Sequence, residues 1–277
     1  MNEEDKIFFG RLDEIINSDN IQEIINERLK YLNSEEYKEE CVVERGMGGI
    51  VTLIKGHISP DIRVDFSAGL NENGYMYDDD SIYEEFLNNI KSCMESLGGK
   101  AKSSITKALK KTVLEYYGDT FNEEKFDDYT LDEAREVYPV YLAQKWCDEN
   151  NVDFLKRPDD IPISISNIKG LGISMCAERA ALVQQLLSFV GAECYYVGSK
   201  CMIDDNGNYE GHAYNVMRSE KGIFIIDLAK ENIGQVFENL DDAIYAKKQI
   251  KAGKYSYGEL SEEQKSKKNI DDVFGDI

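Results

Sequence analysis

Residues 174–228 contain one helix-like segment followed by three strand-like segments that tight turns separate, and this order constrains the fold more than any other feature. The apolar run over about 175–189 has the length of a helix and ends before Gly191, a residue type common at helix C-termini. Strands are predicted over 192–203, 209–218 and 223–228, with turns at 204–208 and 220–222. Strands joined by short turns pair antiparallel, so this part of the chain predicts a helix followed by an antiparallel meander.

Three chemically active residues stand at matching places in these segments: Cys176 near the start of the helix, His212 on the second strand and Asp227 on the third. We expect Ser174 to cap the helix, which puts Cys176 in the first turn, where unpaired N–H groups and the helix dipole favour a thiolate. His212 can take the thiol proton and later protonate a leaving amine. Asp227 can hold the far nitrogen of the imidazole.

The strands that carry His212 and Asp227 are predicted to pair around the 220–222 turn, which brings position 215 opposite 227 and leaves His212 within a few residues. Acyl transfer also requires donors for an oxyanion. The Cys176 backbone N–H is one candidate, and the Asn167 side chain is a weaker second. Because the chain has only two histidines, a histidine in this position carries more information than usual, and the pattern predicts a Cys-His-Asp triad.

The helix entry at Met175 and Cys176, the GHAY sequence at 211–214 and the IDLA sequence at 226–229 resemble the transglutaminase-like superfamily of papain-fold thiol enzymes. The resemblance covers about residues 165–230. It implies that Cys176 is the nucleophile, His212 the general base and then acid, and Asp227 the residue that orients the imidazole. It further implies a cysteine hydrolase or acyltransferase, most simply a cysteine peptidase or amidohydrolase acting on a peptide or amide bond. Cross-linking and deamidation stay open.

Two alternatives also stay open. No tryptophan stands beside Cys176, which favours a catalytically inactive transglutaminase-fold module with a binding or scaffolding role. A zinc site of Cys176, Cys194, Cys201 and His212 is disfavoured because their spacing contains no short chelating pair, and we predict neither a metal nor a cofactor. His57 ends an apolar strand beside a turn, is expected at the strand end or the surface, and is assigned no role.

Residues 1–160 carry a mixed, largely helical pattern, and we expect them to form a separate N-terminal region of unknown role. Helices are predicted over 4–31 with a break at 17–20, over 81–96 and 102–117, and from a capping box at Thr130 and Glu133 to Cys147, with Pro139 bending or restarting the last. Strands are predicted within 49–58 and 62–70. A loop at 157–162 marks the boundary with a catalytic core over 161–277, which ends in helices that begin near residue 240. The predicted fold class is α+β, with a papain-like, transglutaminase-like core in which the cysteine-bearing helix packs on an antiparallel sheet.

The formal net charge of −21 limits the partners of this chain. Binding to nucleic acid or to an anionic membrane surface requires clustered cations, so we expect neither, whereas a neutral or cationic peptide or protein substrate is favoured. No apolar stretch approaches the roughly twenty residues that cross a bilayer, and the N-terminus lacks the basic-then-apolar order of a secretion signal. The six cysteines form no disulfide pattern. These features predict a cytoplasmic protein.

Overall fold

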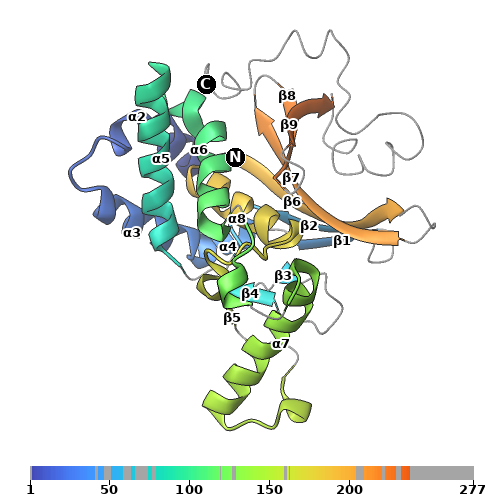
Figure 1. The fold of residues 1–277 in the computed structure, drawn as a ribbon. Helices are drawn as coiled ribbons and strands as arrows, with labels where there is room; N and C mark the ends of the chain where they lie inside the picture. The colour runs from blue at the N-terminus through green and yellow to red at the C-terminus, as the bar shows by residue number, and fades with distance from the viewer. Residues whose placement is uncertain are drawn as a thin grey trace.

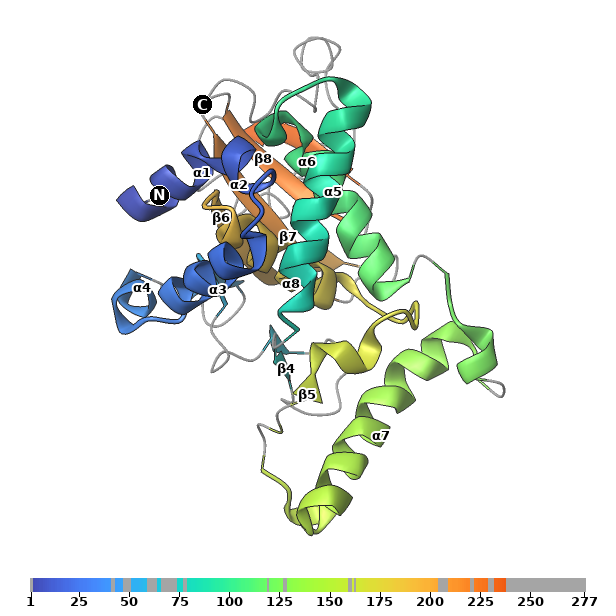
Figure 2. The same cartoon turned by 90° about the vertical axis from the view of Figure 1, so that its left-hand side faces the viewer.

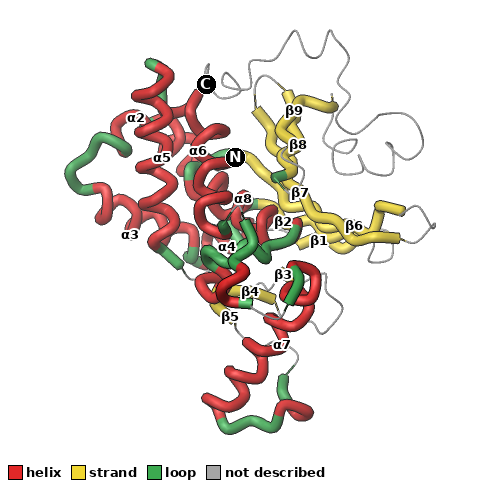
Figure 3. The backbone as a smooth tube through the Cα atoms, viewed as in Figure 1, coloured by secondary structure: helices red, strands yellow, loops and turns green. Residues whose placement is uncertain are grey.

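The computed structural model describes the chain over residues 2–40, 43–46, 51–58, 64–65, 74–76, 79–118, 120–126, 129–158, 161, 163–203, 209–219, 222–228 and 232–237. Within these residues the fold is α+β, as predicted, with most helices gathered on one side of an antiparallel sheet (Figures 1 and 3). The helices predicted from about residue 240 onward lie outside the described residues.

The helices in the first half of the chain begin and end close to the predicted positions. The α-helices are α1 (Glu3–Gly10), α2 (Leu12–Ile15), α3 (Ile21–Leu32), α4 (Glu35–Glu40), α5 (Ser81–Leu97), α6 (Ala101–Tyr117), α7 (Leu131–Asn150) and α8 (Cys176–Phe189), and the 3₁₀ helices are η2 (Glu123–Lys125), η3 (Phe154–Lys156) and η4 (Ile165–Ile168). The predicted capping box starts α7, in which Thr130 and Glu133 bond reciprocally. Helix α7 continues through Pro139, so the predicted restart is wrong. No helix in the described part of the chain combines the length and apolar character needed to cross a bilayer.

The larger sheet has six strands in the order β1-β2-β6-β7-β8-β9, and every neighbouring pair is antiparallel. Its strands are β1 (Val43–Gly46), β2 (Val51–Lys55), β6 (Glu193–Ile203), β7 (Tyr209–Ser219), β8 (Gly222–Asp227) and β9 (Asn232–Phe237). A smaller sheet has the order β3-β4-β5, formed by β3 (Val64–Asp65), β4 (Gly74–Met76) and β5 (Ile163–Ser164). The predicted meander corresponds to β6, β7 and β8, whereas β1 and β9 were not expected from the sequence.

Helix α8 is the centre of the molecule. One side of it packs against β6, β7 and β8, and α3, α5 and α6 cover the other side (Figures 1 and 2). Every residue of α8 is buried except Cys176 and Arg179. Helix α7 projects away from this body (Figure 2). The burial of α8 on both sides explains why its apolar residues are not confined to one face.

The predicted boundary near residue 160 does not divide the structure. Strands β1 and β2 come from the predicted N-terminal region but lie in one sheet with β6 to β9. A single hydrophobic core includes Phe9, Phe86 and Leu109 together with Leu186 and Phe224. The prediction treated a change in local sequence character as a domain boundary, but the strands pair over long separations that local patterns do not reveal.

The loop before α8 is docked on the end of α6. Gly170 and Gly172 donate their N–H groups to the carbonyls of Tyr116 and Tyr117 at 2.8 and 2.7 Å, which satisfies the last turn of α6. Gly172 has a φ of +70°, and a Cβ there would lie 2.0 Å from the Thr120 carbonyl oxygen. Only glycine fits this close approach, so the residues that lead into Cys176 are placed by the N-terminal half of the chain.

Candidate functional site

His212 and Asp227 form the best-defined part of the site. His212 Nε2 lies 2.6 Å from Asp227 Oδ2, and their side chains are 6% and 0% exposed. His212 lies on β7, and Asp227 is the last residue of β8. A buried carboxylate that bonds to Nε2 fixes the orientation of the ring and stabilises an imidazolium. The structure therefore brings these two predicted residues together.

Their contact depends on a register that differs by one residue from the prediction. Ser219 pairs with Gly222, so the turn has two residues rather than three. Continued along the hairpin, this register places Asp227 beside Tyr214, on the same face of the sheet as His212. With position 215 opposite 227, as predicted, the carboxylate would have pointed to the other face, away from the imidazole.

Cys176 is the first residue of α8, but the helix is capped differently from the prediction. The N-cap residue is Met175, whose N–H donates to Glu178 Oε2 at 2.9 Å. Ser174, the predicted cap, instead accepts a hydrogen bond through its hydroxyl from Arg179 Nε at 3.0 Å. The prediction used the local preference of serine for caps and could not include a competing donor farther along the helix.

Backbone donors surround the start of α8. The N–H groups of Cys176 and Ala177 lie in the first turn and donate to no acceptor among the residues that the structure describes. They are two candidate donors for an oxyanion. Cys176 is partly exposed, whereas Cys93, Cys147 and Cys194 are buried free thiols. Among the cysteines with described side chains, Cys176 is therefore the accessible one.

The N-terminal part of α8 lies near the end of β8, the strand that carries Asp227. Gln184, in the middle of α8, accepts a hydrogen bond from Asn215 on β7, so Asn215 faces the helix. Because side chains alternate along a strand, His212 points to the opposite face of the sheet. The first turns of α8 can reach the pair only around the end of β8, and there Arg179 Nη1 donates to the Leu228 carbonyl at 3.3 Å.

The thiol itself is not bonded to the imidazole: within the described ranges, no hydrogen bond joins Cys176 Sγ to His212. The structure thus joins two of the three predicted triad residues and puts the third at the helix end nearest the strand that carries Asp227.

Two arginines hold the segment that precedes Cys176. Arg135, near the start of α7, donates to the Ile173 and Ser174 carbonyls at 3.3 and 3.4 Å. Arg179 binds the Ser174 hydroxyl from the other direction. The residues before the thiol are therefore fixed to α7 and to α8 itself.

Glu178 is a buried carboxyl group two residues after Cys176, and it is 3% exposed. Burial raises its pKa to about 7, although N–H donors from Met175 and from Glu178 itself, together with Arg135 and Arg179, act in the opposite direction. Near neutral pH this group therefore changes charge.

The Asn167 side chain is used locally. Its Nδ2 donates to the Ser164 carbonyl at 3.1 Å, and its own carbonyl accepts from the Tyr138 hydroxyl. The bond to Ser164 closes the turn of η4. The bond from Tyr138, which reaches the main-chain carbonyl of Asn167, joins this turn to α7. Nothing in the described part of the chain joins Asn167 to Cys176, so its role as an oxyanion donor stays a prediction that the structure does not support.

The alternative zinc site is not assembled. Cys194 Sγ lies 3.4 Å from Ser188 Oγ, near the end of α8 opposite Cys176. Twelve helical residues separate Cys176 from Ser188, which corresponds to about 18 Å. Cys176 and Cys194 therefore do not share an ion, and no group of metal-ligating side chains is found among the residues described.

His57 also differs from expectation, because it is 3% exposed rather than at the surface. Its Nε2 lies 3.0 Å from the Tyr83 hydroxyl, and burial, with a smaller contribution from Arg28, lowers its pKa to about 3. His57 is thus a neutral core residue close to the end of β2. The strand-end position was predicted, and the burial was not.

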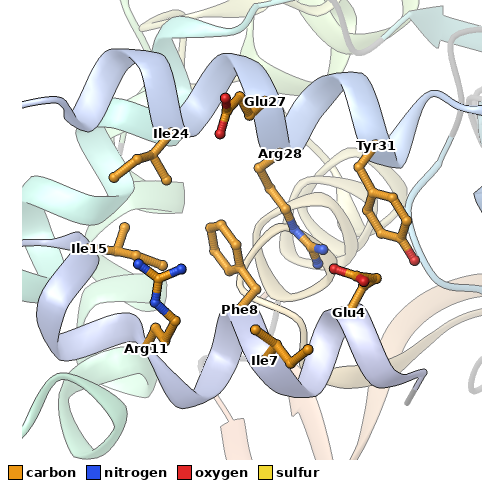
Figure 4. Close-up of a pocket in the computed structure, with 9 residues that line it drawn as sticks. All are labelled: Glu4, Ile7, Phe8, Arg11, Ile15, Ile24, Glu27, Arg28 and Tyr31. Carbon is orange, nitrogen blue, oxygen red and sulfur yellow. The ribbon is translucent and has the colours of Figure 1, made fainter.

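A groove of about 310 Å³ lies between α1 and α3, and neither His212 nor Asp227 lines it (Figure 4). Phe8, Ile24 and Tyr31 line it, and the Arg28 side chain crosses it. Arg28 donates to the Ser188 and Phe189 carbonyls and to the Asp5 carboxylate. These bonds close the C-terminal end of α8, so this arginine has a structural role.

Comparisons of the chain with protein-family models, with curated proteins and with solved structures find no match. The argument for function therefore comes from the site itself.

Sequence analysis does not identify Arg135, Glu178 or Arg179. For Glu178 a signal exists: an acidic residue at the third helical position is typical of a capping box, but methionine at the cap position hides the motif. The two arginines give no local signal, because their partners are backbone carbonyls and a hydroxyl that only the folded chain brings near them.

Proposed function

We propose that the chain is a thiol enzyme of the transglutaminase-like type, with a papain-like core, that cleaves or transfers a peptide or amide acyl group through Cys176, His212 and Asp227. The observation that supports it most strongly is the buried 2.6 Å contact between His212 Nε2 and Asp227 Oδ2. An accessible thiol at the first position of α8 supplies the nucleophile.

The first half of the proposed reaction forms an acyl-enzyme. Because Nε2 of His212 faces Asp227, proton exchange with the thiol falls to Nδ1. Sγ attacks the carbonyl carbon as its proton passes to Nδ1, and the oxyanion accepts hydrogen bonds from the Cys176 and Ala177 N–H groups. The C–N bond then breaks, the imidazolium gives its proton to the leaving amine, and the acyl group stays on Sγ as a thioester.

The second half returns the enzyme to its starting state. Water, or an amine in an acyltransferase, gives a proton to Nδ1 and attacks the thioester carbonyl. The C–S bond breaks, the new acid or amide leaves, and the thiol regains the proton from the imidazolium. Hydrolysis is the default wherever water enters. The net charge of −21 favours a neutral or cationic peptide as the acyl donor.

Alkylation by iodoacetamide, followed by peptide mass spectrometry, tests the proposal for each cysteine separately. Near pH 6 we expect Cys176 to react faster than the buried Cys93, Cys147 and Cys194, and His212→Ala to lower its rate by about tenfold or more. His57→Asn is the matched control, since it removes the other histidine and should leave the rate at Cys176 unchanged. Equal, slow labelling of all cysteines, unaffected by His212→Ala, would contradict the proposal.

The second candidate is a transglutaminase-fold module that binds a partner without turnover. It is favoured by the lack of a hydrogen bond between Cys176 Sγ and His212 in the described residues. The same experiment separates the two functions, because a binding module has no reason to keep a histidine-dependent thiolate.

A further inference from the structure

Cys176 and Arg179 are the two residues of α8 that are not buried. They are three positions apart, so they lie on the same face of the helix, one turn from each other. The thiol and one guanidinium group are therefore the parts of this buried helix that are partly exposed. Because every other residue of α8 except Cys176 is buried, we expect this arginine to have a structural or functional role and not only to keep the surface polar.

The hydrogen bonds of Arg179 indicate this role. Its Nε donates to the hydroxyl of Ser174, which lies just before Cys176 and is 2% exposed. Its Nη1 donates to the carbonyl of Leu228, which directly follows Asp227 and is 4% exposed. One planar side chain thus connects the segment that leads into the nucleophile with the end of the strand that holds the carboxylate.

We propose that Arg179 is a positioning residue that fixes the N-terminal end of α8 against the end of β8, and so sets the separation between Cys176 and the His212–Asp227 pair. This inference rests on the proposed function. The two hydrogen bonds of Arg179 join the segment before Cys176 to the end of β8, and we infer that it acts through these two segments.

Replacing Arg179 by lysine distinguishes a role that depends on its hydrogen-bond geometry from one that depends on its charge. A guanidinium presents several donors in a fixed plane and can bind the Ser174 hydroxyl and the Leu228 carbonyl together. A lysine ammonium keeps the positive charge one turn from the thiol but is a point donor on a flexible stem. If Arg179 acts by position, lysine replaces it poorly. If only charge matters, lysine replaces it fully.

The test is the pH dependence of Cys176 alkylation in Arg179→Lys and Arg179→Met, measured below the thermal unfolding midpoint of each variant. We expect Arg179→Met to lower the rate near pH 6 by about tenfold, because a shift of about 1 Å in a reacting group costs up to about a hundredfold. Near pH 9, where a thiol ionises without help from histidine, the rate should change by less than about twofold. Arg179→Lys should fall between the wild type and Arg179→Met.

Two further variants complete the experiment. Ser174→Ala removes one acceptor and leaves the arginine, and should shift the pH profile in the same direction by a smaller amount, even if Arg179→Met fails to fold. Arg157→Met is the matched control, since Arg157 is also half-buried and, among the described residues, its guanidinium contacts the Phe154 ring and carbonyl. It should leave the profile unchanged.

The outcomes separate this inference from the proposed function. If His212→Ala lowers the rate near pH 6 but Arg179→Met does not, Cys176 is activated without the Arg179 hydrogen bonds, and the positioning role is wrong. If Arg179→Lys matches the wild type, charge is sufficient and the positioning role is also wrong. If the wild-type rate near pH 6 does not depend on His212, the proposed function fails first.

Discussion

The two ends of α8 differ in how their backbone groups are satisfied. At the C-terminal end, Arg28 donates hydrogen bonds to the Ser188 and Phe189 carbonyls and to the Asp5 carboxylate. At the N-terminal end, the Cys176 N–H donates to no acceptor among the described residues. Both ends of a helix have unsatisfied backbone groups and a partial charge. One end of this helix is satisfied by a buried cation, and the other keeps N–H groups that bond to no acceptor among the described residues.

The two cysteines near these ends differ in the same way. Cys194 is buried, bonds to Ser188 and Gln184, and has its pKa raised to about 12 by burial. Cys176 is partly exposed at the helix start. Burial and local surroundings, and not the presence of a thiol, therefore separate a structural cysteine from a candidate nucleophile.

The largest expected loss of stability comes from removing Arg28 from the C-terminal end of α8. Arg28→Met leaves the Asp5 carboxylate and two carbonyls without their cation, and we expect it to lower the free energy of unfolding by about 3–5 kcal/mol. Urea denaturation measures this loss. Arg11→Met, which removes an exposed ion pair, should cost less than about 1 kcal/mol. Equal losses in the two variants would mean that Arg28 does not close the helix.

The histidine near the closed end gives stability a dependence on pH. The pKa of His57 is lowered from 6.5 to about 3, so below about pH 6.5 the unfolded chain binds a proton that the folded chain does not, and stability falls as the pH falls. From about pH 6.5 to 5 this removes about 2 kcal/mol. His57→Asn should lose that part of the slope in urea titrations. An unchanged slope would show that His57 is protonated in the folded protein.

At the open end the slope is expected to have the opposite sign. The pKa of Glu178 is raised from 4.5 to about 7, so between these values the folded chain keeps a proton that the unfolded chain has lost, and stability falls as the pH rises. From about pH 5.5 to 6.5 the loss is on the order of 1 kcal/mol. Glu178→Gln keeps the acceptor for Met175 and should be less sensitive to pH in this range. The two ends do not differ as described if His57→Asn and Glu178→Gln change the slope of stability against pH in the same direction.

The smallest effect is expected at Asn167. Because its amide already bonds to the Ser164 carbonyl, Asn167→Ala should lower the free energy of unfolding by about 1 kcal/mol and change the rate of Cys176 alkylation by less than about twofold. Denaturation and labelling of the same preparation measure both. A large fall in the turnover of any substrate found later, without a change in labelling, would restore Asn167 as an oxyanion donor.

Local patterns predict most of the helices and the His–Asp pair. The caps and apolar spacing of α5, α6 and α7 lie within each segment, and the residues around His212 and Asp227 lie in one hairpin. Features that depend on distant partners are missed. These are the insertion of β1 and β2 beside β6, the burial of His57 by Tyr83, and the bridge from Arg179 to Leu228.

Short-range errors have a different cause. The turn after Ser219 has two residues instead of three, which shifts the predicted register by one and changes the face on which Asp227 lies. Ser174 was predicted to be the helix cap because serine favours that position, but its hydroxyl has another partner. In both places the sequence allows two nearly equal local solutions, and tertiary contacts select one of them.

The most direct test of the account is the ultraviolet absorbance of the Cys176 thiolate as a function of pH, obtained by subtracting the spectrum of Cys176→Ser from that of the wild type. An ordinary thiol ionises at about pH 8.5. We predict that at the same pH the thiolate absorbance is larger in the wild type than in His212→Ala, because the imidazole takes the proton of the thiol. A signal that is the same with and without His212 at every pH would contradict the account.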